Sequence, residues 1–196
     1  MTSGKIERNS LLSLEAYARQ RDDFRARVIA HKKPRTVHLG EHVTLLFEDE
    51  LTIRYQIQEM LRIEKTFEDA GIQDELDAYN PLVPDGRNWK ATMLVEFEDV
   101  DERRQALSRL RGIQDRVWIQ VEARPRVYAI ADEDLARENE EKTSAVHFMR
   151  FELTADTIAA LKAGAALSMG VDHPQYSATL RSVPEATRRA LLADLA

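Results

Sequence analysis

Apolar residues at helical spacing dominate the first part of the chain. After Asn9 and Ser10, either of which can cap a helix, four apolar positions are spaced so that they lie on one helical face. These positions are Leu14, Tyr17, Phe24 and Val28. The helix should end near the segment HKKP, because Pro34 cannot continue it.

A second helix is expected over residues 50–69, closed by Gly71. Its apolar stripe, counted from Ile53, consists of Ile57, Met60, Leu61, Ile63 and Phe67. At about 100° per residue, Glu64 falls about 20° from the centre of this stripe, and Gln56 also lies within it. Two polar side chains of this helix are therefore expected to face inward, whereas a surface helix normally turns such groups to water.

The remainder of the chain alternates between strand and helix patterns. Strands are expected over residues 35–39, 42–48, 89–98, 116–123, 126–131, 144–152 and 166–173. Helices are expected over residues 72–79, 101–112, 132–142, 154–164 and 183–196, with a proline-bracketed loop over 80–86.

Two strand–helix–strand units in the second half of the chain resemble each other. With a shift of 54 residues, Phe97 aligns with Phe151 and Leu107 with Leu161. This match indicates a possible internal duplication, although two halves of one sheet with the same patterning would also look alike. If the unit is duplicated, both strands of each copy should lie in one sheet, with Leu107 and Leu161 facing it.

These elements predict an α+β fold, with a mixed and largely antiparallel sheet and helices packed on it. The chain of 196 residues is 43% hydrophobic, which is enough to bury a sizeable core. We therefore expect a single domain over residues 1–196.

Composition narrows the classes of function. No apolar run approaches the roughly 18 to 20 residues that cross a bilayer. The first ten residues lack the apolar core of a signal peptide. We therefore expect a cytoplasmic protein without a membrane anchor. The absence of cysteine excludes disulfides, thiolate metal sites and an iron–sulfur cluster held by the chain itself. A net charge of −6 with both signs interspersed does not favour nucleic acid.

An inward arginine accompanies the inward glutamate. Arg21 falls inside the apolar stripe of the first helix, and pairing with Glu64 would satisfy both charges. Arg150 is the other candidate partner of Glu64. The pair can be a structural tie between two helices, or the polar floor of a pocket, because buried charge networks also mark functional sites.

Two histidines have positions that suggest chemistry. Strand alternation puts His147 on one face with Met149 and Phe151, and Arg150 on the other, which favours a core histidine bonded to backbone.

His173 ends a strand beside Asp172 and Tyr176. Two histidines and a carboxylate can hold a metal, so His147 and His173 are candidate ligands, although their spacing is not diagnostic. Motifs for nucleotide cradles and for a nucleophile elbow do not occur, and the sequence leaves the cofactor unknown.

Four separated motifs carry a family resemblance. In order along the chain, the motifs are YQIQEMLRIEK, YNPLVPDG, TSAVHFMRF and DHPQY. Together they resemble an uncharacterised bacterial family known as domain of unknown function family 3501, and the resemblance covers nearly the whole chain. The resemblance implies a redox or peroxide-stress setting, since genes of that family lie beside those of rubrerythrin-like proteins and of iron–sulfur oxidoreductase subunits resembling the heterodisulfide reductase type. Any cluster would then belong to the partner.

Two functional hypotheses follow. The first is an accessory protein that associates with an iron–sulfur or rubrerythrin-like partner through an exposed face. The second is a small-ligand or metal-dependent enzyme. Its candidate pocket would be lined by Arg21, Gln56, Glu64, His147, Arg150, His173 and Tyr176. An enzyme should bring these groups to one concave site, and an accessory protein should leave them scattered or paired inside.

Overall fold

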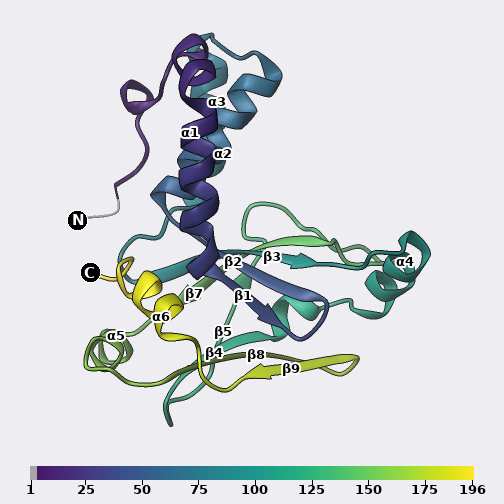
Figure 1. Cartoon of the computed structure of the whole chain (residues 1–196). Coiled ribbons are helices and arrows are strands. Elements are labelled where there is room, and N and C mark those ends of the chain that lie inside the picture. The colour runs from purple at the N-terminus through teal and green to yellow at the C-terminus, as the bar shows by residue number, and fades with distance from the viewer. Residues whose placement is uncertain (1–3) are drawn as a thin grey trace.

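A helical arm stands on a body made of two β-sheets in the computed structural model, which describes residues 4–196 (Figure 1). The arm contains α1 (Leu14–Lys32), α2 (Glu50–Glu64) and α3 (Asp69–Tyr79). Three further helices lie on the body, with α4 (Val100–Arg109) at one end and α5 (Ala155–Lys162) and α6 (Glu185–Leu192) at the other. No described helix is both long and apolar enough to span a membrane.

Side chains at the helix starts explain where the main helices begin. Ser13 accepts a hydrogen bond from the Ala16 amide at the start of α1, and Asp49 forms a reciprocal capping box with Thr52 at the start of α2. The α2 helix ends at Lys65, which adopts the left-handed conformation at φ 55°.

Every strand pair in the described chain is antiparallel. One sheet has the order β1-β2-β3-β7-β6 and the other has the order β5-β4-β8-β9. The first sheet is formed by β1 (Thr36–Leu39), β2 (Val43–Glu48), β3 (Asn88–Val95), β7 (Val146–Glu152) and β6 (Ile130–Ala131). The second is formed by β5 (Val127–Tyr128), β4 (Val117–Val121), β8 (Leu167–His173) and β9 (Tyr176–Leu180).

The described residues form two hydrophobic cores. The larger one lies between the two sheets and includes Phe47, Trp89 and Phe151 together with residues of the three body helices. The smaller one lies inside the arm, where Ile53, Ile57 and Leu61 of α2 meet residues of α3 and of the N-terminal segment. Because burial of apolar surface is the main stabilising term, each part has its own source of stability.

A buried ion cluster ties the base of the arm to the C-terminal helix. Arg35, which is 2% exposed, donates two hydrogen bonds to Asp194, at 2.9 and 2.7 Å, and one of its nitrogens lies 3.0 Å from Asp49. His31 at the end of α1 lies 2.5 Å from the same Asp49 carboxylate. Burial raises the pKa of Asp194, and the Arg35 guanidinium opposes that effect. We call Arg35, Asp49 and Asp194 the joint.

The α+β class and the largely antiparallel pairing of the strands are confirmed, and the strands form two sheets where one was expected. Both repeat units follow the same plan, in which a strand of the first sheet leads through a helix to a strand of the second: β3–α4–β4 and β7–α5–β8. The strands of each unit thus lie in different sheets, contrary to expectation. Leu107 and Leu161 are both buried in the core between the sheets.

Several other elements differ from the sequence-based expectation. Residues 132–142 form an irregular loop instead of a charged helix, and Asp132 at their start is left-handed at φ 53°. Gly71 lies inside α3 and does not close α2. The expected strand over residues 126–131 is split into β5 and β6, which pair with different sheets, and strand β9 was not anticipated.

Candidate functional site

Arg21 is paired as expected, but its partner is Glu59 and not Glu64. The guanidinium donates two hydrogen bonds to Glu59, of 2.8 and 2.9 Å, and the Tyr17 hydroxyl donates a third at 2.6 Å. Hydrogen bonding by Arg21 lowers the pKa of Glu59 to about 2. Burial raises the pKa of Tyr17 well above its ordinary value. The three side chains join α1 to α2 and form no open pocket floor.

The inward orientation of Glu64 is wrong, because Glu64 is the last residue of α2 and lies beyond Leu61, where the part of the helix that packs in the arm core ends. Glu64 is exposed, as are Ile63 (61%) and Phe67 (71%). The true stripe is Ile53, Ile57 and Leu61, together with Gln58. Gln58 can be buried because its amide exchanges hydrogen bonds of 2.7 and 3.3 Å with the backbone of Leu12.

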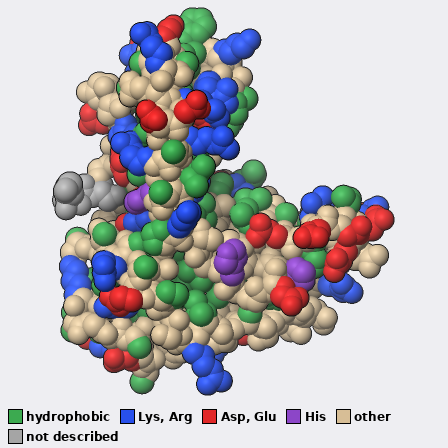
Figure 2. Space-filling model, viewed as in Figure 1, with side chains coloured by type: hydrophobic (Ala, Val, Ile, Leu, Met, Phe, Trp, Pro, Cys, Tyr) green, Lys and Arg blue, Asp and Glu red, His purple; other side chains and the backbone are tan. Residues whose placement is uncertain are grey.

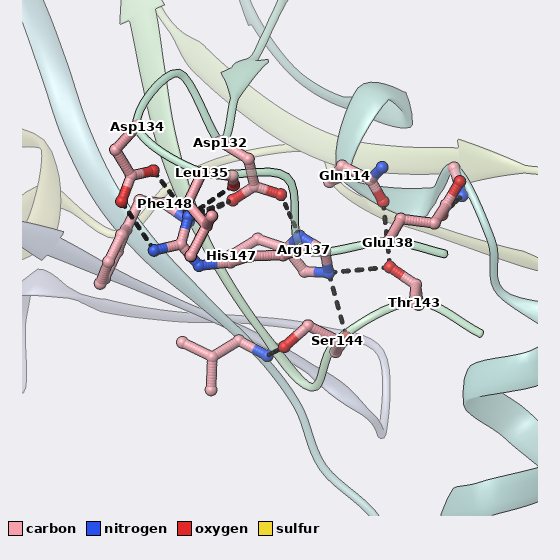
Figure 3. A network of polar contacts seen from close by, with 12 residues as sticks. Gln114, Asp132, Asp134, Leu135, Arg137, Glu138, Thr143, Ser144, His147 and Phe148 are labelled. Atoms are coloured by element: carbon pink, nitrogen blue, oxygen red, sulfur yellow. Dashed lines mark hydrogen bonds and ion pairs between the residues drawn. The ribbon is translucent and has the colours of Figure 1, made fainter. Parts of the chain in front are cut away.

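His147 is a core histidine, as strand alternation predicts, and it is fully buried. Its Nδ1 lies 2.6 Å from Asp132, and its Nε2 lies 3.0 Å from both the Thr143 hydroxyl and the Ser144 carbonyl (Figure 3). Thr143 also donates to Gln114 at 3.3 Å. A carboxylate, an imidazole and a hydroxyl are thus in the order used for nucleophilic catalysis.

The contacts of this network favour a structural role. The Asp132 carboxylate accepts from Nδ1 of His147, and Nε2 lies against the Thr143 hydroxyl and the Ser144 carbonyl. Protein groups therefore occupy both ring nitrogens, and neither is open to a metal or a substrate. Thr143 is only 1% exposed, so a substrate could not reach its hydroxyl without movement of the surrounding loop.

Arg137 stabilises the loop of residues 132–143, which covers His147. Its guanidinium donates to Asp132 and forms a two-point contact with Asp134, and it lies 4.5 Å from the centre of the Phe148 ring (Figure 3). Asp132 in turn accepts from the backbone amide of Phe148 at 3.1 Å. Through these contacts residues 132–143 are held against strand β7 without regular secondary structure.

The other candidate residues do not converge with His147. Arg150 lies on the opposite face of β7, as expected, where Glu133 and Glu152 hold it. His173 is buried in the second sheet, and its ring accepts from the Gln175 amide and donates to the Arg111 carbonyl.

Tyr176 faces His173 across the β8–β9 ladder, but its hydroxyl donates to the Leu39 carbonyl. Gln56 is half-buried on α2 in the arm. The expected pocket is therefore not assembled. The described residues also contain no group of three or more His, Asp or Glu that could hold a metal.

A groove on the body, which the sequence reading missed, has a different character. It runs between the end of the β2–β3 pair, α4 and the start of β7, and its volume is about 810 Å³. Leu94, Phe97 and Val146 supply apolar surface. The carboxylates that line it are Glu41, Glu96, Glu98 and Glu102. We call it the acidic groove.

The carboxylates of the acidic groove are available to a partner. None of the four carboxylates forms an ion pair with a described residue. Most arginines elsewhere in the described chain already have an acidic partner, so they do not neutralise the groove. Acidic side chains gather around α4 on this face of the molecule (Figure 2). Acidic residues in the first turn of α4 also stabilise the helix, but Glu41, Glu96 and Glu98 lie outside it. The run EFEDVDE, residues 96–102, was the signal in the sequence.

His42 is the aromatic side chain of the acidic groove with an open hydrogen-bonding position. Its ring stacks on Phe97 with centres 3.9 Å apart and planes 15° apart. Nδ1 lies 2.9 Å from the Glu96 carbonyl and donates to it, so in the neutral ring the lone pair lies on Nε2. No described residue is bonded to Nε2. This nitrogen is therefore an acceptor available at the groove.

A second hollow lies at the tip of the arm. It has a volume of about 670 Å³ and is lined by apolar residues that include Leu11, Leu61 and Ile72, with exposed Phe67 beside them. Its charged lining residues are Glu7, Glu15 and Arg8, and Arg8 is already paired with Asp69, so the hollow has no strong excess of one charge that would select an occupant.

Comparison with known proteins places the whole chain in one family. A crystal structure of a novel protein of unknown function from Burkholderia pseudomallei is 57% identical, with a TM-score of 0.94, and the match covers 98% of this chain and 100% of that one. Among curated proteins no similar sequence is found. The family model described as "Protein of unknown function (DUF3501)" matches residues 5–195. The chain therefore belongs to the DUF3501 family, as its four motifs predicted.

Proposed function

We propose that this protein is an accessory protein that binds a basic partner protein through the acidic groove. The observation that carries the proposal is the combination of an apolar floor with four carboxylates that are free of ion pairs. Apolar surface surrounded by charge of one sign is typical of a protein interaction site. The charge selects a partner whose contact surface carries lysine and arginine.

The proposed partner is a redox protein, either rubrerythrin-like or an iron–sulfur oxidoreductase subunit, in the cytoplasm of a bacterium under peroxide stress. Weak electron-transfer and other redox encounters use small interfaces, and complementary charge speeds their association. The chain has no cysteine, so an iron–sulfur cluster would be held by the partner. The family resemblance supplies this setting, and the acidic groove supplies a surface suited to it.

Titration calorimetry with purified candidates tests the proposal. A rubrerythrin-like protein and an iron–sulfur subunit from the same bacterium are each mixed with the full chain at low and at physiological salt. We expect one of them to bind, with an affinity that falls as salt rises, because exposed charges are screened. The double variant Glu98→Gln/Glu102→Gln should weaken binding about tenfold.

A matched control separates the groove from the overall charge. Glu140→Gln/Glu141→Gln removes the same charge from exposed positions outside the groove and should bind like the unaltered protein. Failure of both candidates to bind, or equal weakening by the two double variants, would show that the proposal is wrong.

A further inference from the structure

We infer, resting on the proposed function, that the partner anchors itself in the acidic groove with an arginine side chain. The groove offers three features that one guanidinium can use together: the Nε2 acceptor of His42, carboxylates on its walls, and an apolar floor. These features come from different elements, namely the turn before β2, the end of β3, and α4.

His42 is held in one orientation before any partner arrives. The stack on Phe97 fixes the plane of its ring, and the hydrogen bond to the Glu96 carbonyl fixes the proton on Nδ1. The backbone amide of His42 donates to the Tyr176 hydroxyl at 3.1 Å, which ties the turn to strand β9. The acceptor on Nε2 is therefore preorganised, so little ordering is needed when a donor binds.

The carboxylates supply the charge. The Glu96 carboxylate already accepts from the Thr44 hydroxyl at 2.6 Å, but those of Glu41, Glu98 and Glu102 accept from no described residue. Arg103 is the single cation that lines the groove, against four carboxylates, so the lining is negative overall. A donor-rich cation is the ligand that such a lining favours.

Arginine fits this lining better than lysine. Its planar guanidinium presents five donors, which can serve a carboxylate and the imidazole acceptor at the same time, and it is more weakly hydrated than an ammonium group. Its methylene stem can lie along Leu94 and Val146 while the charged head stays among the carboxylates. Arginine is also over-represented among the residues that dominate protein interfaces.

The experiment is an NMR titration of the isotope-labelled full chain with a blocked Gly-Arg-Gly peptide. We expect saturable shifts of the His42 Nε2 resonance and of the Phe97 and Glu98 amides, with a dissociation constant in the millimolar range. The same peptide with citrulline has the same shape without the charge and should bind about tenfold more weakly. Equal binding of the citrulline or the lysine peptide, or shifts confined to other surfaces, would overturn the inference.

Two variants test the role of the imidazole. His42→Phe keeps an aromatic ring on Phe97 but removes the Nε2 acceptor, and it should weaken the arginine peptide at least about fivefold. Gln20→Phe is the control, since it also puts an aromatic ring in place of a polar side chain, at an exposed position on α1 outside the groove. Binding unaffected by His42→Phe would contradict the inference.

The two proposals can fail separately. If a redox partner binds in the salt-dependent way while the peptide does not, the proposed function stands and the arginine anchor is wrong. If the peptide binds in the groove while neither redox candidate does, the anchor stands and the redox partner is wrong.

Discussion

Glu59 shows how one carboxylate can hold two helices together. It accepts hydrogen bonds from Tyr17 and Arg21 of α1 while it belongs to α2, and its side chain is only 13% exposed. The hydrogen bonds from Arg21 keep it ionised down to a pKa of about 2, compared with 4.5 for an ordinary glutamate. Its charge is therefore part of what keeps the arm folded.

We expect Glu59→Gln to lower the free energy of unfolding by about 2 kcal/mol at neutral pH, because Arg21 loses its ionic partner. Since the folded pKa is depressed, this stabilisation is present above pH 4.5 and is lost as the pH falls toward 2. Urea unfolding of both proteins across this range checks the prediction. The stability difference should shrink in acid, and Glu64→Gln should have almost no effect at any pH. A constant difference would show that the charge of Glu59 is not responsible.

At the residue scale, the sequence predicted the existence of an inward ion pair but not both of its members. Arg21 is identified correctly because it lies on the same face of α1 as Tyr17 and Val28, the two residues that this helix buries. Glu64 lies on the buried face of the helical wheel, but it is the last residue of α2, where the arm core has ended and Ile63 and Phe67 are exposed as well. A helical wheel gives the face of a helix and not how far along the helix the core extends. Exposed apolar residues of this kind are common on protein surfaces, and a helical wheel cannot recognise them.

The loop of residues 132–143 is the element where local sequence was least informative. Its charge-rich composition suits a solvated helix, yet it has no apolar stripe to fix one against the body. Instead Arg137 and Asp132 fold it back on strand β7 above His147. The strand itself was predictable, because alternation over residues 146–152 puts His147, Met149 and Phe151 on the core side.

His147→Phe should release this loop while the sheets remain folded. The change removes the hydrogen bonds to Asp132 and to the Ser144 carbonyl, and it leaves buried acceptors unpaired, at a cost of about 1 to 3 kcal/mol. Limited proteolysis should then cut within residues 132–143 at least about ten times faster. His38→Phe changes an exposed histidine and should leave the rate unchanged. Equal cleavage of the two variants would contradict the locking role.

Two hydrophobic cores and one ionic joint organise the whole molecule. Neither the arm nor the second sheet could be predicted from the sequence, because both depend on which distant segments pack together, whereas periodicity reports only the local face. The joint depends on a contact between Arg35 and Asp194, which are 159 positions apart. Such a contact has no local signature.

Arg35→Met should destabilise the protein by about 3 to 5 kcal/mol, since Asp194 and Asp49 would lose a buried counter-charge. The double variant Arg35→Met/Asp194→Leu should recover a large part of this loss, because no unpaired carboxylate of Asp194 remains. Urea unfolding of the single and double variants measures the coupling between the two residues. Additive effects would show that the joint contributes no specific pairing energy.

The order of the arm segments along the chain has a consequence for synthesis. Helix α1 is made first, but its main partner α2 follows only after the β1–β2 hairpin, and that hairpin pairs with strand β3, which is made later still. The N-terminal helix thus leaves the ribosome with Tyr17 and Val28 uncovered, and it stays so until about thirty further residues have emerged. During this interval Tyr17 has no Glu59 to bond, and Arg21 has no ionic partner on α2. The arm can therefore close only after synthesis has passed the β1–β2 hairpin, although its first helix is complete much earlier.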